Sequence, residues 1–196
     1  SDNTCETCNT YNMLKLTRHL FSWQPTAALG DYYERALYNH ILASQNPEDG
    51  MMCYFVPLRM GTKKQFSDSL NTFTCCVGSG MENHGKYGEA IYYEGADASL
   101  YVNLFIPSTL NWNAKKVQVE QLTNFPEGDS VAIRIHAKSP TKFTLRFRQP
   151  AWAPVPVINI NGRSVKTEVD ANGFIAVQHE WKNNDEITVN FIKSLH

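Results

Sequence analysis

The sequence has no long apolar run and no excess of charge of either sign. Hydrophobic residues make up 42% of the 196 positions. They occur in runs no longer than about eight residues, whereas a helix that crosses a bilayer needs roughly 20. The 18 Lys and Arg residues balance 19 Asp and Glu residues, and no basic block is present that could neutralise a run of phosphates. Neither nucleic acid nor a membrane is therefore expected as a partner.

Cysteine is absent from the whole of the chain after residue 76. The five cysteines are Cys5, Cys8, Cys53, Cys75 and Cys76. An odd number with one adjacent pair is a poor disulfide framework, and a chain of this length can bury a stable core without one. A metal site or a reactive thiol is one interpretation, and small buried hydrophobes are the other. The second interpretation suits Cys53 best, because it lies inside the apolar run 51–56.

The spacing of the cysteines also fits a generic zinc site. Cys5 and Cys8 would form one half of such a site, and Cys75 and Cys76 the other half. Adjacent cysteines are unusual in structural zinc fingers, whose second half normally repeats the two-residue gap. The residues alone leave the metal site and the buried-hydrophobe interpretation open.

The first half of the chain has mostly helical patterns. Apolar residues at helical spacing predict a helix over 10–22, and a second helix is expected to open at Gly30 with Asp31 as its N-cap. Residues 51–58 are expected to form a strand. Segment 72–80 is expected to be a glycine-bearing loop before a helix that begins near Met81 or Glu82. Cys75 and Cys76 would then lie at a helix entrance, which favours thiolate over thiol.

From about residue 98 the apolar period changes to two, which is typical of strands. Seven strands are expected, over 100–106, 116–121, 131–137, 143–148, 155–160, 174–178 and 186–192. Asn161-Gly162 is a strong hairpin turn, and Asn172-Gly173 is a second candidate. Short strands of this kind without a helical pattern favour an antiparallel sandwich. The expected fold is therefore α+β, with one domain over residues 1–95 and a β domain over 96–196.

Several other side chains are weaker candidates for a role in function. Glu82 and His84 follow the cysteine loop, but an acid in a first helical turn is more often a cap or a dipole partner. His40 is interpreted as an ordinary helix residue. Tryptophan in a sandwich is usually a core or interface residue rather than a platform for sugars, and this interpretation applies to Trp112, Trp152 and Trp181.

The order of four motifs resembles a known enzyme family. Glu6-Thr7-Cys8, residues 54–58, Cys75-Cys76 and residues 100–104 resemble, in that order, the β-L-arabinofuranosidases of glycoside hydrolase families 127 and 146. Residues 150–152 and the Asn161-Gly162 turn are similar to the β-sandwich that follows the catalytic barrel in those enzymes. Segment 76–88 resembles family 146 more than family 127.

This resemblance implies an architecture and a set of site residues. Residues 1–95 would be the last helices of an (α/α) barrel, and residues 96–196 an antiparallel β-sandwich. The resemblance implies four ligands of a Zn²⁺ ion, Glu6, Cys8, Cys75 and Cys76. Cys75 would also be the catalytic nucleophile, and Tyr54 would lie near the sugar as a substrate-binding residue. Glu6 and Cys8 would bind as i and i+2 of an extended segment, with Cys5 and Thr7 facing away.

The function implied is that of a zinc-dependent retaining glycoside hydrolase. Its substrate would be an arabinose-containing plant glycan or oligosaccharide. In the family the acid/base glutamate lies upstream of the Glu-x-Cys motif, so the upstream barrel region of the same protein is an expected partner and this chain alone is expected to be inactive. The cysteines leave the compartment open, and a periplasmic or extracellular parent enzyme is favoured.

Two alternatives remain at this point. The chain could be a non-catalytic module in which a structural zinc ion or buried cysteines support the helices, while the sandwich binds carbohydrate or a partner domain. A barrel wall left open could instead leave the site disordered. The apolar faces of helices over 10–22 and 30–45 would then favour oligomerisation.

Overall fold

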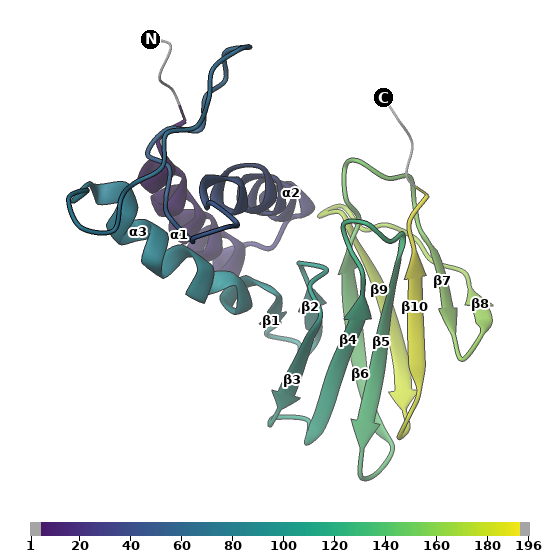
Figure 1. Cartoon of the computed structure of the whole chain (residues 1–196). Coiled ribbons are helices and arrows are strands. Elements are labelled where there is room, and N and C mark those ends of the chain that lie inside the picture. Colours follow the sequence, from purple (N-terminus) through teal and green to yellow (C-terminus); the bar gives the residue numbers. More distant parts are fainter. Residues whose placement is uncertain (1–4, 193–196) are drawn as a thin grey trace. The chain divides into compact units, whose positions relative to one another are not determined.

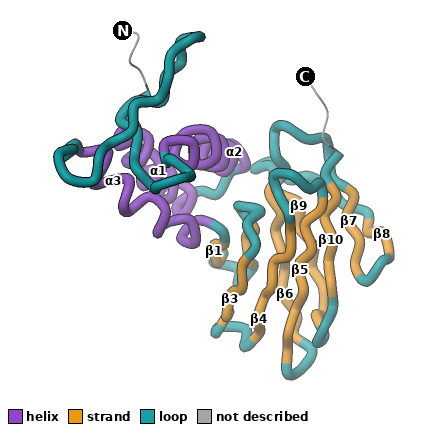
Figure 2. Tube along the Cα trace, viewed as in Figure 1, coloured by secondary structure: helices purple, strands orange, loops and turns teal. Residues whose placement is uncertain are grey.

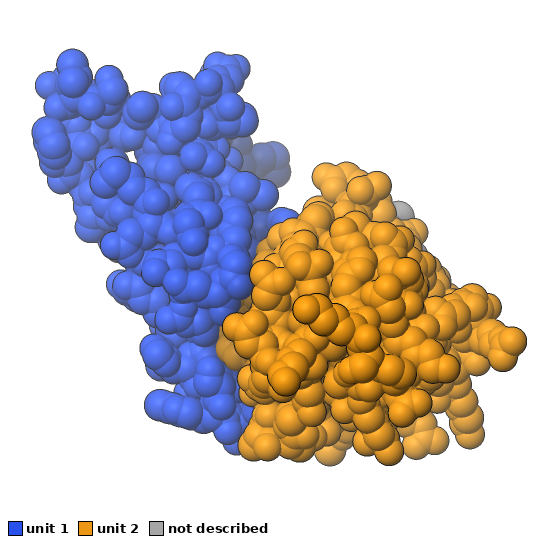
Figure 3. Space-filling model, turned by 90° about the horizontal axis from the view of Figure 1, so that it is seen from below, with its two compact units in different colours: residues 1–25, 31–89 blue, residues 26–30, 90–196 orange. Residues whose placement is uncertain are grey.

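The structure is a computed structural model that describes residues 5–192. The chain divides into two compact units (Figure 3). The helical unit comprises residues 1–25 and 31–89, and the sheet unit comprises residues 26–30 and 90–196. Few helices precede mainly antiparallel sheets, so the expected α+β class is confirmed. No helix within residues 5–192 is both long and apolar enough to cross a membrane.

Helix α1 (Thr7–Trp23) confirms the helix expected over 10–22 and begins three residues earlier. Its buried residues recur at intervals of three and four, as one face of a helix requires. They are Thr7, Tyr11, Leu14, Thr17 and Phe21. The helix ends before Gln24, whose extended backbone (φ −145°, ψ 92°) is the conformation that the following Pro25 favours.

The second helix begins earlier than expected. Helix α2 (Ala27–Ala36) starts after Thr26, whose hydroxyl oxygen accepts a hydrogen bond from the Leu29 amide at 3.4 Å. The prediction of Asp31 as N-cap is therefore wrong, because a threonine at the correct spacing already caps the helix. The chain continues as a π-helical turn (Leu37–Ile41) and a 3₁₀ turn (Leu42–Ser44).

The strand expected over 51–58 is wrong. Residues 45–74 form loops and turns (Figure 2), and the apolar run makes only isolated bridges, between Gln45 and Met52, Cys53 and Phe66, and Glu6 and Phe55. The run is apolar because Met52 and Cys53 are buried, at 8% and 1% exposure. Burial in a loop leaves the same apolar signature as a short core strand.

The third helix also begins earlier than the position predicted from the glycine-bearing segment 72–80. Helix α3 (Cys75–Asn83) starts at Cys75 itself, not near Met81, and the 3₁₀ helix η3 (His84–Ala90) follows. A Cβ atom at Gly80 would lie 2.5 Å from Met52 Cγ, so glycine here permits close packing of the helix on Met52 rather than a turn.

The sheet unit contains two sheets (Figure 1). The four-stranded sheet has the order β1 (Tyr92–Glu94), β2 (Leu100–Val102), β6 (Thr141–Arg148) and β9 (Phe174–Trp181). The six-stranded sheet has the order β3 (Ser108–Trp112), β4 (Val117–Thr123), β5 (Ser130–Ala137), β10 (Glu186–Asn190), β7 (Val157–Ile160) and β8 (Arg163–Val165). Both sheets contribute side chains to one hydrophobic core.

One pair of strands departs from the antiparallel expectation. Strands β2 and β6 are parallel, with Leu100 opposite Leu145. The chain leaves β2 for the other sheet, forms β3, β4 and β5 there, and only then enters β6. A long crossover of this kind can return in the original direction, which a hairpin cannot do.

The two hairpin turns differ in type. Asn161 and Gly162 join β7 to β8 with φ angles of 49° and 77°, as a two-residue type I′ turn requires. The Asn172-Gly173 turn is instead the end of a three-residue loop, because Asp170 and Phe174 are the residues that pair across it. Both turns were predicted, and only the second has a different length.

The tryptophans of the sheet unit lie in or against its core, as expected. Trp112 and Trp181 are buried, at 5% and 0% exposure, and the Trp181 indole donates a hydrogen bond to the Phe143 carbonyl. Trp152 is half-buried and stacks on Phe125. These rings are packed against protein, so they do not present open faces to a sugar.

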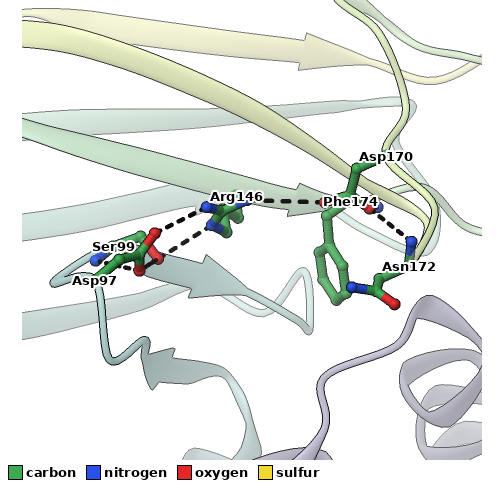
Figure 4. A network of polar contacts seen from close by, with 6 residues as sticks. All are labelled: Asp97, Ser99, Arg146, Asp170, Asn172 and Phe174. Atoms are coloured by element: carbon green, nitrogen blue, oxygen red, sulfur yellow. Dashed lines mark hydrogen bonds and ion pairs between the residues drawn. The ribbon is translucent and has the colours of Figure 1, made fainter.

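A polar network joins the loop before β2 to the loop before β9 (Figure 4). Arg146 on β6 contacts Asp97 at 2.8 Å, Ser99 Oγ at 3.1 Å and Asp170 at 3.7 Å. Asp170 Oδ1 also accepts the amides of Asn172 and Phe174. The Ser99 hydroxyl, followed by the Arg146 guanidinium, lowers the pKa of Asp97 to about 2.

Candidate metal centre

Two helix starts in the helical unit bring four candidate metal ligands together. Glu6 is the last extended residue before α1, and Cys8 lies in the first turn of that helix. Cys75 and Cys76 are the first two residues of α3, which packs on α1. The carboxylate oxygen and the three sulfur atoms all lie within 4.8 Å of one another.

The individual separations are close to those of a coordination shell. Cys8 Sγ lies 3.0 Å from Glu6 Oε1 and 3.4 Å from Cys75 Sγ. Cys75 Sγ lies 3.6 Å from the same Glu6 oxygen. Tetrahedral zinc has Zn–S and Zn–O distances of about 2.3 and 2.0 Å, which place neighbouring sulfur atoms about 3.8 Å apart and a sulfur and an oxygen about 3.5 Å apart. The separations among Glu6, Cys8 and Cys75 therefore lie within about 0.5 Å of those in a tetrahedral zinc shell.

The donor set also fits zinc chemically. Three thiols and one carboxylate provide the soft sulfur ligands that zinc accepts, and hard cations such as Mg²⁺ or Ca²⁺ prefer oxygen alone. Cys75 is exposed whereas Cys76 is 1% exposed, so the two adjacent thiols face different surroundings. One thiol faces solvent while the other anchors the cluster to the core.

The groups of the cluster compete for protons. The Cys8 thiol, followed by the Tyr54 hydroxyl, lowers the pKa of Glu6 through hydrogen bonds to its carboxylate. The same carboxylate raises the pKa of Cys8 and of Tyr54, and burial raises the pKa of Cys76. A divalent cation would relieve this crowding, because it replaces the thiol protons as the partner of the ligand atoms.

Cys5 and Thr7, the neighbours of Glu6, are not among the clustered groups. The hydroxyl of Thr7 is buried and lies 2.8 Å from the carbonyl oxygens of both Cys53 and Tyr54. The pairing of Cys5 with Cys8 that a finger-like site needs is not formed. The ligand segment is extended only at Glu6, because α1 has already begun at Thr7. The expectation that Cys8 would also be extended is therefore wrong.

Tyr54 lies at the edge of the cluster. Its hydroxyl donates a hydrogen bond to Glu6 Oε1 at 2.9 Å and lies 3.7 Å from Cys75 Sγ. Tyr54 also lines a cavity of about 350 Å³, whose other lining residues are Phe55, Pro57, Thr62, Lys63 and Gln65. The exposed thiol of Cys75 thus has a phenol and an open hollow beside it.

The candidates Glu82 and His84 lie outside the cluster. Glu82 accepts a short hydrogen bond from the Tyr11 hydroxyl, and His84 Nδ1 lies 2.5 Å from the Tyr87 hydroxyl. Glu82 is near the end of α3 and not in its first turn, because the helix begins at Cys75. Both side chains therefore bond to tyrosine hydroxyls and not to the clustered ligand groups.

The sequence interpretation missed His40. This residue is 9% exposed, and its ring contacts both α1 and the segment that leads into it. Nδ1 is 2.8 Å from the Thr10 hydroxyl, and Nε2 is 2.8 Å from the Cys5 carbonyl oxygen. Burial lowers the pKa of His40. A single histidine on an amphipathic helix carries no signal of such contacts, because they depend on a π-helical turn that sequence periodicity does not reveal.

Comparison with protein families identifies two matching domains. Residues 1–89 match the catalytic domain of the GH127 β-L-arabinofuranosidases, and residues 99–192 match the middle domain of the same enzymes. Both models are for family 127, so the closer similarity of segment 76–88 to family 146 stays a prediction. Curated protein sequences contain no match to this chain.

Solved structures with the same fold include three glycoside hydrolases. A GH127 β-L-arabinofuranosidase from Geobacillus stearothermophilus T6 superposes with a TM-score of 0.81 and 24% identity, over 95% of this chain and 31% of that chain. The GH127 β-arabinofuranosidase BT3674 gives 0.81 and 24%, over 96% and 32%. A protein described as a glycoside hydrolase gives 0.82 and 22%, over 95% and 32%.

The chain thus spans about a third of the length of these structures, and the two family models cover both of its units. The order of the matched domains, catalytic and then middle, is the order of the helical and sheet units. The chain belongs to the GH127 β-L-arabinofuranosidase family.

Proposed function

We propose that this chain is the metal-binding part of a zinc-dependent retaining β-L-arabinofuranosidase, with Cys75 as the nucleophile. The observation that carries the proposal is the cluster of Glu6, Cys8, Cys75 and Cys76, whose ligand atoms lie within 4.8 Å of one another. Membership of the GH127 family supports the reaction class. The substrate would be an arabinose-containing plant glycan or oligosaccharide.

The architecture proposed for the parent enzyme follows from the two units. The helical unit would be the end of an (α/α) barrel, and the sheet unit a β-sandwich, divided near residues 95 and 96. One face of helix α1 exposes large apolar side chains, and a face of this kind indicates a packing partner. These are Met13, Leu16, Leu20 and Trp23, at 40%, 45%, 36% and 77% exposure. The upstream barrel region is the proposed partner of this face.

In the proposed reaction the Cys75 sulfur attacks the anomeric carbon of the arabinofuranose. The bond from that carbon to the leaving oxygen breaks, and the oxygen takes a proton from a carboxylic acid. In the second step water attacks the same carbon and gives a proton to the carboxylate left by the first step, the C–S bond breaks, and the arabinose leaves with retained configuration. A bound zinc ion would supply a thiolate at neutral pH and stabilise the sulfur as it departs.

The other residues of the cluster would position Cys75 rather than react. Cys76 is buried and anchors the start of α3, while Glu6 and Cys8 approach from α1. Tyr54 donates its single hydroxyl proton to Glu6 Oε1 and lies 3.7 Å from Cys75 Sγ, so its oxygen can accept a hydrogen bond from a hydroxyl of a sugar bound beside the sulfur. We assign Tyr54 a substrate-binding role on this geometry.

The non-catalytic alternative has weaker support. A carbohydrate-binding sandwich usually presents aromatic faces to the sugar, and the tryptophans of the sheet unit pack in or against its core. An exposed thiol beside a hollow also leaves room for a substrate, which a structural zinc site does not need.

Zinc content of purified variants tests the proposal. The full chain should bind one zinc ion, and Glu6→Ala, Cys8→Ala and Cys76→Ala should each lose it or bind it far more weakly. Cys5→Ala is the matched control, because Cys5 lies next to Glu6 but outside the cluster. Zinc that depends on Cys5 and not on Glu6 would overturn the proposed ligand set.

A further inference from the structure

We propose that His40 is a positioning residue for the metal centre, which holds the chain on both sides of the ligands Glu6 and Cys8. The inference rests on the proposed metal-binding function. Its evidence is nevertheless independent of that function, because it concerns hydrogen bonds made by residues that are not ligands.

The first observation is that one imidazole ring bridges two points of the ligand segment. Nε2 lies 2.8 Å from the Cys5 carbonyl oxygen, one residue before Glu6. Nδ1 lies 2.8 Å from the Thr10 hydroxyl, two residues after Cys8. A carbonyl can only accept, so Nε2 carries the proton and donates it. In the neutral ring Nδ1 then accepts from Thr10, and both ring nitrogens are satisfied.

The second observation is the local backbone. Cys5 has a φ of 61°, a left-handed conformation that costs a residue with a Cβ atom free energy. The Cys5 carbonyl accepts from His40 and also from the Val56 amide at 3.3 Å. These two donors hold the turn through which the chain enters α1. The direction of the next residue, Glu6, depends on that turn.

The third observation is the helical irregularity that carries the histidine. His40 lies in the π-helical turn Leu37–Ile41, between α2 and a 3₁₀ turn. A π turn inserts an extra residue and changes the direction of the side chains that follow, and such turns are frequent at functional sites. Here it points a polar ring, 9% exposed, into the packing against α1.

Because of these contacts, His40 would affect the metal centre indirectly, through the residues that it bonds. Both of its nitrogens are occupied by Cys5 and Thr10, and it is not one of the clustered ligand groups. Loss of the ring would release the segment that carries Glu6 and Cys8 while leaving all four ligands in the chain. Outer partners of this kind typically change metal affinity by about 10- to 100-fold.

The test compares four variants of the full chain. His40→Phe fills similar volume but lacks both nitrogens, and His40→Gln retains an N–H donor near the position of Nε2. Thr10→Val removes the hydroxyl donor alone. Ser44→Ala is the matched control, because Ser44 is fully buried in the same irregular segment, its hydroxyl donates to the Ile41 carbonyl, and it lies outside the cluster.

Three readouts are needed besides thermal unfolding. Zinc affinity is measured by competition with a chromophoric chelator, and ligand geometry by the absorption bands of the Co²⁺-substituted chain. In the metal-free chain, hydrogen exchange of the Thr7 and Thr10 amides, which bond to Tyr54 O and Glu6 O, reports the order of the ligand segment.

His40→Phe should weaken zinc binding at least tenfold, shift the Co²⁺ bands and speed exchange at both amides. His40→Gln should recover most of the zinc affinity. The zinc affinity of Thr10→Val should lie between those of His40→Phe and the parent chain, and that of Ser44→Ala should equal the parent value. Unchanged exchange and unchanged Co²⁺ bands in His40→Phe would overturn the inference, as would a Gln variant no better than Phe. If the parent chain binds no zinc, the proposed function fails, and exchange in the metal-free variants alone decides the role of His40.

Discussion

Cys75 and Cys76 are adjacent at the start of one helix, yet their side chains lie in different surroundings. Cys75 is exposed at the first position of α3, whereas Cys76 is 1% exposed and faces the helical core. The first residue is accessible to solvent, and the second packs in the core from which the first projects. Adjacent cysteines looked unusual for a zinc site from sequence, and the helix geometry explains them, because successive side chains on a helix point about 100° apart.

This difference predicts unequal effects on the stability of the metal-free chain. Cys76→Ala should lower the free energy of unfolding by about 1 kcal/mol, since it removes buried atoms, while Cys75→Ala should stay within about 0.5 kcal/mol. Urea unfolding in the presence of a chelator measures both. Equal destabilisation by the two variants would contradict the assigned roles.

The sequence could predict part of the site, and the remainder depends on tertiary packing. The cysteine positions alone paired Cys5 with Cys8, and Glu6 entered the ligand set in place of Cys5 only through resemblance to a family. His40 could not be found, because its partners are a backbone carbonyl and a hydroxyl some 30 residues away that only the fold brings close.

At the scale of elements, α3 shows why glycines misled the prediction of a helix start. Gly78 and Gly80 favoured a loop, yet both lie inside the helix. Helical propensity disfavours glycine by about 1 kcal/mol per residue, but packing on Met52 requires it at position 80. The strand expected over 51–58 failed for a related reason, because burial alone does not supply a partner strand.

Alanine substitutions at the two glycines of this helix should therefore change the free energy of unfolding in opposite directions. Gly80→Ala should destabilise the chain by about 1–3 kcal/mol, because its Cβ would meet Met52 Cγ at 2.5 Å. Gly78→Ala is the matched control, since its Cβ would meet no described atom within 4 Å apart from its chain neighbours and the backbone of its own helix, and it should stabilise the chain by up to about 1 kcal/mol. Thermal or urea unfolding distinguishes them, and a neutral Gly80→Ala would mean that the helix does not pack on Met52.

The network around Arg146 predicts a pH dependence in the sheet unit. The pKa of Asp97 is about 2 in the folded chain against an ordinary value of 3.8, so its contribution is full above about pH 4 and is lost as the pH falls toward 2. Because the Asp97 side chain is 55% exposed, the contribution is about 1 kcal/mol or less.

Asp97→Asn should therefore be slightly less stable than the parent chain at pH 7, with a difference that narrows below about pH 4. Ser99→Ala should show the same trend, since the Ser99 hydroxyl is the largest cause of the low pKa of Asp97. Urea unfolding at several pH values measures this. A difference that is constant from pH 7 to pH 3 would show that the carboxylate charge is not involved.

At the scale of the whole molecule, the period-two pattern predicted seven of the ten strands in the described part of the sheet unit, and no expected range covers β1, β3 or β8. The pattern also did not predict the crossover between the sheets. Alternation places Val131, Ile133 and Ile135 in the core whatever the neighbouring strand is. It carries no information on strand order, so the parallel pairing of β2 with β6 could not be predicted. Long-range order of this kind is set by the fit of the two sheets over their shared core.

We also predict that the chain alone lacks the acid/base group that catalysis needs. It spans about a third of the solved GH127 structures, and we expect the acid/base carboxylic acid in the remainder. The chain alone should therefore release no arabinose from a β-L-arabinofuranoside, while a longer protein that includes the upstream barrel region should. Measurable hydrolysis by the 196-residue chain would refute this expectation.

The metal shell is the central claim, and X-ray absorption at the zinc edge tests it most directly. The zinc-loaded chain should show three sulfur atoms at about 2.3 Å and one oxygen at about 2.0 Å, from Cys8, Cys75, Cys76 and Glu6. Cys5→Ala should leave that shell unchanged. A shell of four sulfur atoms, or one that loses a sulfur atom in Cys5→Ala, would contradict the account.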